Sequence, residues 1–463
     1  MNTLPGARAF SRADRRTPAL ALLSLLQFLI ALDVTVVNVA LPSIGERFHA
    51  SAASLSWVVT GYTLVGGGLL LLGGRITDLL GRRRMFLLGA GLFALASLTA
   101  GAAPTLPVLV LARFAQGAGE ALASPAAMSL IALLFPAPAE RAKALGVWGV
   151  ISSGGLVAGV LLSGFITELL HWRWIFGINV PLAAGVLLLA PKLLPADGPR
   201  AHAGRLDLPG AALLTAGPLC LVHGVMEAAP HTITAGVLLL AAFVVVEART
   251  RHPLMPLSLL THRVRAVANG VTALLSAALS TAFFLLTLYM QDVMGLGPLR
   301  TGLAFLPFCA VLLLAVSRVA RLVEAFGTKY TALTGLACTA AGLAWLARLP
   351  GQGAYALDVL PGMTGIAAGM GIGLVALQNA ALSGVTDHDA GTAAGIQRSV
   401  DQLGGSLGLA VLVGLSMGPG DAGGFRTAFL HATAAVAAAA VLLLLAARDG
   451  GAADDRADPG DRG

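Results

Sequence analysis

The chain has 463 residues, of which 57% are hydrophobic and only 11% are charged, whereas a soluble globular protein has roughly 25% charged residues. Its mean hydropathy of +0.83 comes from long runs of Leu, Ala, Val and Gly, which excludes a soluble fold and predicts an all-α integral membrane protein. The net charge of +7 is divided among short basic clusters between apolar runs, which is typical of loops held at an anionic leaflet and argues against nucleic acid as a partner.

The apolar runs recur along the whole chain. A helix that crosses a hydrocarbon core of about 30 Å needs roughly 20 apolar residues, and by this measure the sequence predicts about fourteen transmembrane helices. They are expected at residues 18–41, 55–74, 85–103, 107–135, 144–167, 174–194, 208–226, 232–247, 266–290, 301–320, 330–349, 356–383, 392–417 and 425–447. The first run follows an arginine-rich stretch, as a signal peptide would, but it is too long and lacks a cleavage site, so we expect it to be retained.

The charged residues and the Pro- and Gly-rich stretches between the apolar runs predict how the helices are organised. Most of the 30 Lys and Arg residues fall on alternate connections, which places both termini in the cytoplasm. Stretches rich in Pro, Gly or Arg at 191–209 and 249–265 separate two blocks of helices. We expect a cytoplasmic N-terminal tail at residues 1–17, a six-helix lobe at 18–195, a linker with two extra transmembrane helices at 196–255, a second six-helix lobe at 256–447 and a disordered cytoplasmic tail at 448–463.

The first predicted helix carries an acidic side chain, Asp33, inside the bilayer. An Asp in a spanning helix costs a few kcal/mol on insertion scales, so it indicates a function. The alternative is a structural Asp that snorkels or bonds to a neighbouring helix.

The connection between the second and third helices, residues 74–84, reads GRITDLLGRRR. A basic cytoplasmic turn would explain the charge. A carboxylate between glycines, followed by arginines, favours a tight turn with an ion-pair latch. The residues concerned are Gly74, Arg75, Asp78, Gly81, Arg82 and Arg83.

Two further ionisable residues, Arg113 and Glu120, lie in the fourth helix. They are seven positions apart and therefore fall within about 20° of one helix face. Asp33 and Arg113 both lie roughly 9 to 12 Å from the outer ends of their helices, so we expect them to pair. A carboxyl group at this depth can exchange its proton when its partner or its access to water changes. Glu120 is either a relay partner for the proton or a contact for a cationic substrate.

Small residues line the fifth helix at intervals of four, at Gly155, Gly159 and Ser163, with Gly164 beside them. This pattern predicts close packing against another helix. In the thirteenth helix, Arg398 and Asp401 are three residues apart and are expected to neutralise one another, the alternative being a direct coupling role for Asp401.

Other chemistries have little support in the sequence. The three cysteines lie in apolar runs without metal-ligand spacing, so we expect neither a disulfide nor a metal site. The glycines at 369–373 lie within an apolar helix, and no Walker-type Gly-Lys-Ser/Thr sequence occurs, so neither ATP nor another cofactor is expected. Transport across the membrane must then draw on an ion gradient, and we expect protons to be the coupling ion. Each proton contributes roughly 2.3 kcal/mol per 100 mV of membrane potential.

The loop at 74–84 resembles the signature of the major facilitator superfamily in which Gly, a basic residue, Asp, Gly, Arg and a basic residue recur, and it departs from that signature at Leu79. Residues 32–42, 113–121, 172–181, 289–295 and 402–408 resemble segments of the fourteen-helix drug:proton antiporters of that superfamily. The resemblance implies two six-helix lobes with two helices between them, and it implies that the loop at 74–84 holds a cytoplasmic gate between the two lobes. The fifth helix departs from the antiporter pattern, since Gly159-Val160 and Ser163-Gly164 stand where the family has Gly-Pro and Gly-Gly pairs.

Three functions follow as hypotheses. The first is a proton-coupled exporter of a small amphipathic drug or antibiotic that works by alternating access. The Ala-, Gly- and Arg-rich amino-acid usage suggests a bacterial source and therefore the inner membrane. The second is a major facilitator carrier for another solute, such as an amino acid, siderophore or lipid, without strict proton antiport. The third, a membrane enzyme or receptor, would need a polar catalytic cluster or a large extramembrane domain.

Overall fold

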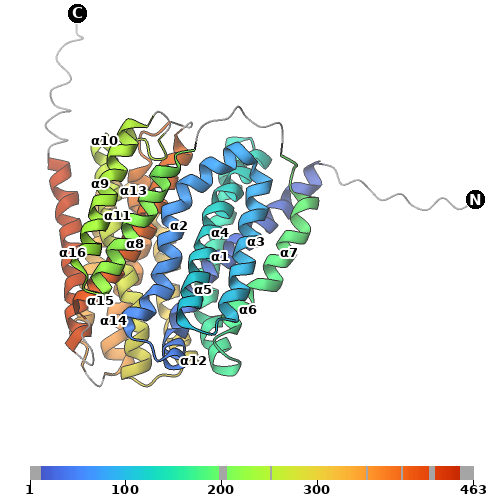
Figure 1. Ribbon diagram of the computed structural model, residues 1–463. Coiled ribbons are helices and arrows are strands. Elements are labelled where there is room, and N and C mark those ends of the chain that lie inside the picture. Colours follow the sequence, from blue (N-terminus) through green and yellow to red (C-terminus); the bar gives the residue numbers. More distant parts are fainter. Residues whose placement is uncertain are drawn as a thin grey trace, which may run out of the picture.

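A computed structural model of the chain describes residues 12–197, 206–250, 253–350, 353–386, 389–416 and 423–448, and the regular structure in these ranges is helical (Figure 1). The N-terminal lobe contains α1 (Arg12–Phe48), α2 (Ala52–Leu80), α3 (Arg82–Gly101), α4 (Leu106–Leu134), α5 (Pro138–Leu169), α6 (Trp174–Gly177) and α7 (Asn179–Leu193). A hairpin follows, formed by α8 (Leu208–Met226) and α9 (Pro230–Arg249). The C-terminal lobe contains α10 (Ser258–Thr261), α11 (Arg263–Leu288), η1 (Tyr289–Val293), α12 (Pro298–Ala304), α13 (Leu306–Leu346), η2 (Tyr355–Val359), α14 (Leu360–Ala381), α15 (Ala390–Ser416) and α16 (Gly423–Arg448).

The described residues contain 13 helical segments that are long and apolar enough to cross a membrane, and one of them, Pro298–Leu346, is 49 residues long. The chain reverses within this segment at Gly327, whose φ of 75° and ψ of 161° are not helical. Ala315 and Gly335, on either side of it, both lie against the same part of α14, at Gly371 and Gly373. The segment therefore makes two crossings, as predicted for 301–320 and 330–349, and the predicted total of fourteen helices is confirmed.

The ends of the predicted helices differ from those in the structure. Helix α1 begins at Arg12 rather than at residue 18, and the first eleven residues lie outside the described ones, as does nearly all of the predicted C-terminal tail. The predicted linker at 196–255 includes α8 and α9, and its residues 198–205 and 251–252 are also outside the described ranges.

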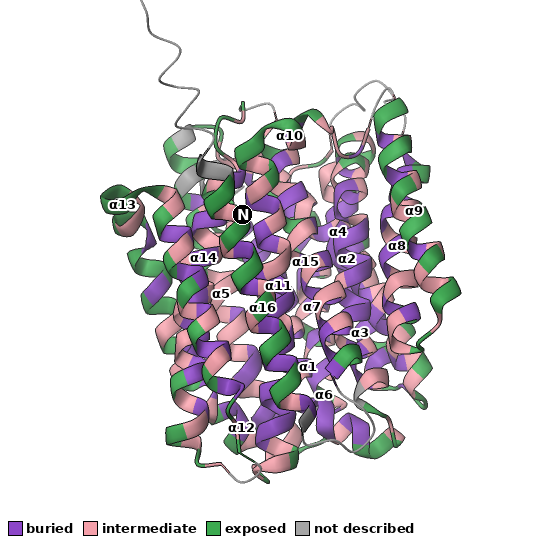
Figure 2. Ribbon diagram, turned by 90° about the vertical axis from the view of Figure 1, so that its left-hand side faces the viewer, coloured by how far each residue is buried: buried purple, intermediate pink, exposed green. Residues whose placement is uncertain are grey.

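Many large apolar side chains are exposed on the outside of the helix bundle. Figure 2 shows that buried residues are concentrated on the inner helices and on the inward faces of the outer ones. On α3, for example, Leu88, Leu95 and Leu98 are each more than half exposed, whereas Phe86 and Phe93 on the opposite face are fully buried. An apolar outer surface of this kind is stable only in lipid.

The α8–α9 hairpin lies over the seam between the two lobes. Helix α8 packs against α2 of the N-terminal lobe and against α15 of the C-terminal lobe, which also contact each other. The approach to α2 is close, since a methyl group on Gly68 would lie 2.6 Å from the Thr215 hydroxyl. Near the far end of α8, Gly414 of α15 lies against Val225.

The lobes also meet on the side opposite the hairpin, at the end of the bundle where α12 lies (Figure 1). There the Glu168 carboxylate of α5 accepts a hydrogen bond of 2.8 Å from the Leu299 amide of α12. The Gln291 amide donates a second bond, also of 2.8 Å, to the Val39 carbonyl of α1. Towards the other end of α5 there is free space at Gly146 and Gly149, where an added methyl group would meet nothing within 4 Å.

Candidate functional site

An ion pair lies in the centre of the N-terminal lobe, where the guanidinium of Arg113 on α4 contacts the carboxylate of Asp33 on α1. The side chains are 1% and 0% exposed. Burying two charges is costly unless each is paired and hydrogen-bonded, so this contact sets the local structure of both helices. The structure thus brings together the two residues that helix depth predicted to pair.

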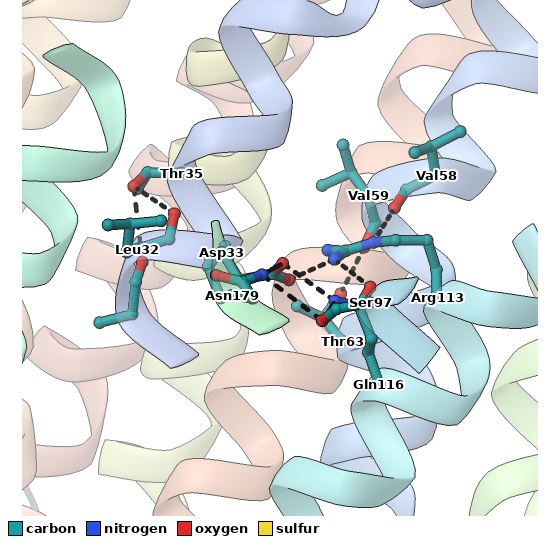
Figure 3. A network of polar contacts seen from close by, with 12 residues as sticks. Leu32, Asp33, Thr35, Val58, Val59, Thr63, Ser97, Arg113, Gln116 and Asn179 are labelled. Atoms are coloured by element: carbon teal, nitrogen blue, oxygen red, sulfur yellow. Dashed lines mark hydrogen bonds and ion pairs between the residues drawn. The ribbon is translucent and has the colours of Figure 1, made fainter. Parts of the chain in front are cut away.

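Amide and hydroxyl groups from α4 itself and from two other helices, α3 and α7, surround the pair (Figure 3). The Gln116 side chain accepts a 2.9 Å bond from Arg113 and donates a 3.0 Å bond to Asp33. Asn179 of α7 donates a 2.8 Å bond to the same oxygen of Asp33. Gln116 also donates to the Ser97 hydroxyl of α3 at 2.8 Å. The side-chain amides of Gln116 and Asn179 form an amide frame around Asp33. Each amide can rotate to exchange the positions of its donor and acceptor atoms, so the hydrogen bonds of this frame can adjust to a change in the charge of Asp33.

The Arg113 guanidinium is held from other sides as well. Its Nε donates a 2.8 Å bond to the Val58 carbonyl of α2, and its charge lies 4.4 Å from the centre of the Tyr62 ring. A cation over an aromatic face gains electrostatic energy that increases when water is excluded. Arg113 therefore keeps a favourable position even when its contact with Asp33 changes.

Glu120, two turns from Arg113 on α4, faces the other lobe. Gln402 of α15 donates a 2.9 Å bond to Glu120 Oε1, and the Arg398 guanidinium lies 3.8 Å from the same oxygen. The second oxygen, Oε2, is buried and accepts no hydrogen bond from a described residue. The Tyr62 hydroxyl lies close to this carboxyl group, so Tyr62 lies between the Glu120 site and the Arg113 ion pair.

Arg398 has two acidic neighbours. It forms the expected ion pair with Asp401 at 3.3 Å, and Asp401 also accepts a 2.6 Å bond from the Ser276 hydroxyl of α11. Because Arg398 also reaches Glu120, it connects the acidic groups of the two lobes. Neighbouring bonds join α2 and α15 directly, since the Thr63 and Ser406 hydroxyls are in contact.

The loop at 74–84 forms a tight connection between α2 and α3. Gly81 has a φ of 109°, a conformation that a side chain would strain, and a methyl group there would lie 2.5 Å from the Asp197 carboxyl. Asp197, which follows α7, accepts bonds of 2.8 and 3.1 Å from the backbone amides of Arg83 and Arg84 and so caps the start of α3.

The other residues of this loop lie around the cap. Gly74, Arg75 and Asp78 are on the last turns of α2, and Arg82 begins α3. Asp78 is exposed and forms no ion pair with a described residue, so the carboxylate that contacts the arginine segment is Asp197. The sequence offered no signal for Asp197, because nearly all of the intervening lobe separates it from the loop.

The small residues of α5 lie against α1 and the opposite lobe. A methyl group on Gly155 would lie 2.5 Å from the Phe28 carbonyl, and the Ser163 hydroxyl donates to the Val36 carbonyl. Gly164 faces Pro298 of α12. This stripe therefore brings α1 close to α5 and closes the seam at the end where α12 lies.

Gly159 occupies the most crowded position of this stripe. In Gly159→Ala the new methyl group would lie 2.1 Å from Thr35 Oγ1 and 2.6 Å from the Leu32 carbonyl, so α1 and α5 must separate. We expect a loss of about 1–3 kcal/mol in stability, seen as a lower melting temperature of the purified protein. Gly149→Ala on the same helix, where a methyl group meets nothing within 4 Å, is the matched control. Equal melting temperatures for the two variants would contradict the packing described here.

Among the described residues, no group of three or more His, Cys, Asp and Glu side chains is placed to hold a metal ion. The polar groups that meet inside the bundle are instead carboxylates, guanidinium groups, amides and hydroxyls. Such a set can bind and release protons and can form ion pairs with an organic cation.

Comparison with known proteins gives this arrangement a context. The sequence profile described as Major Facilitator Superfamily matches residues 23–409. A lincomycin resistance protein of Streptomyces lincolnensis is 50% identical over 432 residues, which cover 90% of this chain and 89% of that protein. A puromycin resistance protein of Streptomyces alboniger is 41% identical over 415 residues, covering 87% and 82%. The solved nucleoside transporter NupG superposes with a TM-score of 0.69 at 11% identity, covering 93% of this chain and all of that one.

Proposed function

This chain belongs to the major facilitator superfamily, as a transporter of its drug-efflux group and not as an enzyme, and we propose that it exports a small amphipathic antibiotic or drug in exchange for protons. The names of the two resistance proteins support the substrate class. The Asp33–Arg113 pair supports the coupling ion, because a fully buried carboxylate inside a membrane helix is a group that can carry a proton through the transport cycle.

The two lobes provide the alternating access. In the structure the α5–α12 contacts close one end of the seam, and α5 is open towards the other. The distribution of Lys and Arg assigns the open end to the cytoplasm, from which a substrate would be taken up. Rocking of the lobes would then separate Glu168 from Leu299 and open the outer end.

Coupling follows from competition for acidic groups. A proton that reaches Asp33 removes the charge that holds Arg113, and the amide frame then rearranges. Glu120 lies between this pair and the other lobe, and the free oxygen on its carboxylate can receive either a proton or the cationic group of a substrate. Antiport results when the substrate enters this site as the proton leaves it.

Inverted membrane vesicles test this function directly. Vesicles that contain the chain are acidified inside by respiration, and a panel of antibiotics and amphipathic dyes is added. The panel includes a lincosamide and an aminonucleoside. We expect at least one compound, one of these two among them, to discharge the preformed proton gradient and to accumulate inside the vesicles. Vesicles without the chain are the control. Accumulation that is insensitive to a protonophore would contradict proton coupling, and no discharge by any compound would contradict antiport.

A further inference from the structure

A second pair of acidic side chains lies in the α8–α9 hairpin, far from the site described above in both sequence and structure. Asp207 caps the start of α8, where its Oδ1 accepts a 2.8 Å bond from the Gly210 amide. Glu247 is on the last turns of α9, and its Oε2 accepts a 3.0 Å bond from the Met255 amide in the connection to α10. The two residues are 5% and 3% exposed.

The remaining oxygens of these carboxyl groups face each other. A methyl group on Gly210 would lie 2.7 Å from both Asp207 Oδ2 and Glu247 Oε1, which places the two atoms at the same point of the α8 surface, and the two side chains are within hydrogen-bonding reach. Neither oxygen accepts a bond from an N–H or O–H donor of a described residue. Both atoms are thus buried acceptors without a donor between them.

No cation neutralises this pair among the residues that the structure describes. The other charged or titratable side chains on the hairpin and on the helices that pack against it are His223 on α8, Glu227 after α8, His231 and Arg249 on α9, Arg75 and Asp78 on α2, and Arg398 and Asp401 on α15. None of the described ion pairs includes Asp207 or Glu247. Two buried carboxylates that face each other without a cation repel one another, so a donor placed between them would stabilise the pair.

We infer that Asp207 and Glu247 form a proton-binding site, in which a single proton bonds Asp207 Oδ2 to Glu247 Oε1. A proton is a donor that fits between two buried carboxyl oxygens that face each other and have no cation between them. The bound proton holds the start of α8 to the end of α9 and, through Met255, holds the connection that leads to α11. Its loss leaves two anions in contact and weakens that attachment.

The proton also makes stability depend on pH. In the unfolded chain both carboxyl groups ionise above about pH 4, whereas the folded pair keeps one proton. The folded state thus binds more protons at neutral pH, and its stability falls as the pH rises until the pair releases its proton. Glu247→Gln supplies an amide donor in place of the proton, and Asp207→Asn keeps a side chain that can cap α8.

Purified full-length protein in nanodiscs provides two readouts. The infrared spectrum of the wild type at neutral pH should contain the carbonyl band of a protonated carboxylic acid that is missing from both Asp207→Asn and Glu247→Gln. The melting temperature of the wild type should fall from mildly acidic to mildly alkaline pH, and this pH-dependent part should be lost in Glu247→Gln. Glu227→Gln, an exposed carboxyl at the other end of the hairpin, is the control and should behave as the wild type.

Three results would overturn the inference. One is a carbonyl band that is unchanged in both variants. Another is the same pH profile of melting for the wild type and Glu247→Gln when the variant is folded. The third is a rise in the wild-type melting temperature with Mg²⁺ or Ca²⁺ that disappears in Asp207→Asn/Glu247→Gln, since this would identify the site as one for a metal cation.

Discussion

Asp33→Asn is expected to abolish the discharge of a proton gradient by substrate in inverted vesicles. Asn keeps the shape of Asp33 and can still accept bonds from Gln116 and Asn179, but it cannot take up a proton. It also leaves the Arg113 guanidinium buried without its counter-charge, and breaking a buried pair in this way destabilises a protein by about 3–5 kcal/mol. Transport against a gradient should therefore fall to the level of vesicles without the protein.

A double variant separates the loss of coupling from the loss of stability. Asp33→Asn/Arg113→Gln removes both charges, so no unpaired ion is left, and its melting temperature should recover most of what the single variant loses. Transport should stay absent, because the proton-carrying group is still missing. Proton release by Asp33→Asn at the wild-type rate would remove Asp33 from the coupling mechanism, and transport by the double variant would show that the single variant fails only by misfolding.

Glu120→Gln is expected to raise the half-saturating concentration of a cationic substrate about tenfold, which corresponds to about 1.4 kcal/mol, and to leave that of a neutral substrate unchanged. The amide loses the negative charge that faces a cation, and bonds to charged groups are roughly twice as strong as neutral ones. Gln402 can still bond to the new side chain, and Arg398 keeps Asp401, so the seam between the lobes should remain intact.

The measurement is concentration-dependent uptake of a cationic dye and of an uncharged antibiotic into the same inverted vesicles. Glu140→Gln, an exposed carboxyl at the start of α5 that pairs with Arg16, is the matched control. Unchanged half-saturation for both compounds would contradict a substrate contact at Glu120. An equal loss for both, together with a loss of proton release, would instead place Glu120 on the proton path as a relay to Asp33.

The sequence could predict what depends on one helix at a time. Hydropathy gave the fourteen crossings, and the depth of Asp33 and Arg113 along their helices was enough to expect contact between them. It could not identify Asn179 as a partner of Asp33, or Ser97 as a partner of Gln116, because an Asn or Ser in an apolar helix has no pattern that distinguishes a buried partner from one that bonds to its own backbone. Residues 172–181 resemble a segment of the drug:proton antiporters, and this resemblance indicated that the region around Asn179 has a function. It did not indicate which side chain Asn179 contacts.

Contacts across the lobes were beyond sequence reasoning for a different reason. Arg398 and Asp401 are close in sequence and were expected to neutralise one another, yet Arg398 also reaches Glu120, 278 positions earlier in the numbering. That contact depends on the packing of α2 and α15, which no periodicity encodes. The turn at Gly327 shows a milder form of the same limit. Both flanking helices were predicted, but the continuation of helical structure on each side up to Gly327 was not.

The two sides of the seam between the lobes are not equivalent. On one side α2 and α15 are in contact and the α8–α9 hairpin covers both, while on the other α5 meets α12 only at one end. A rotation that opens the bundle must then pivot about the covered side, and the gap appears beside α5, where helices face the acyl chains directly. On the proposed function, an amphipathic compound dissolved in the membrane would reach the polar centre sideways through this gap, so its partition into the membrane, and not its aqueous concentration, sets the supply for transport.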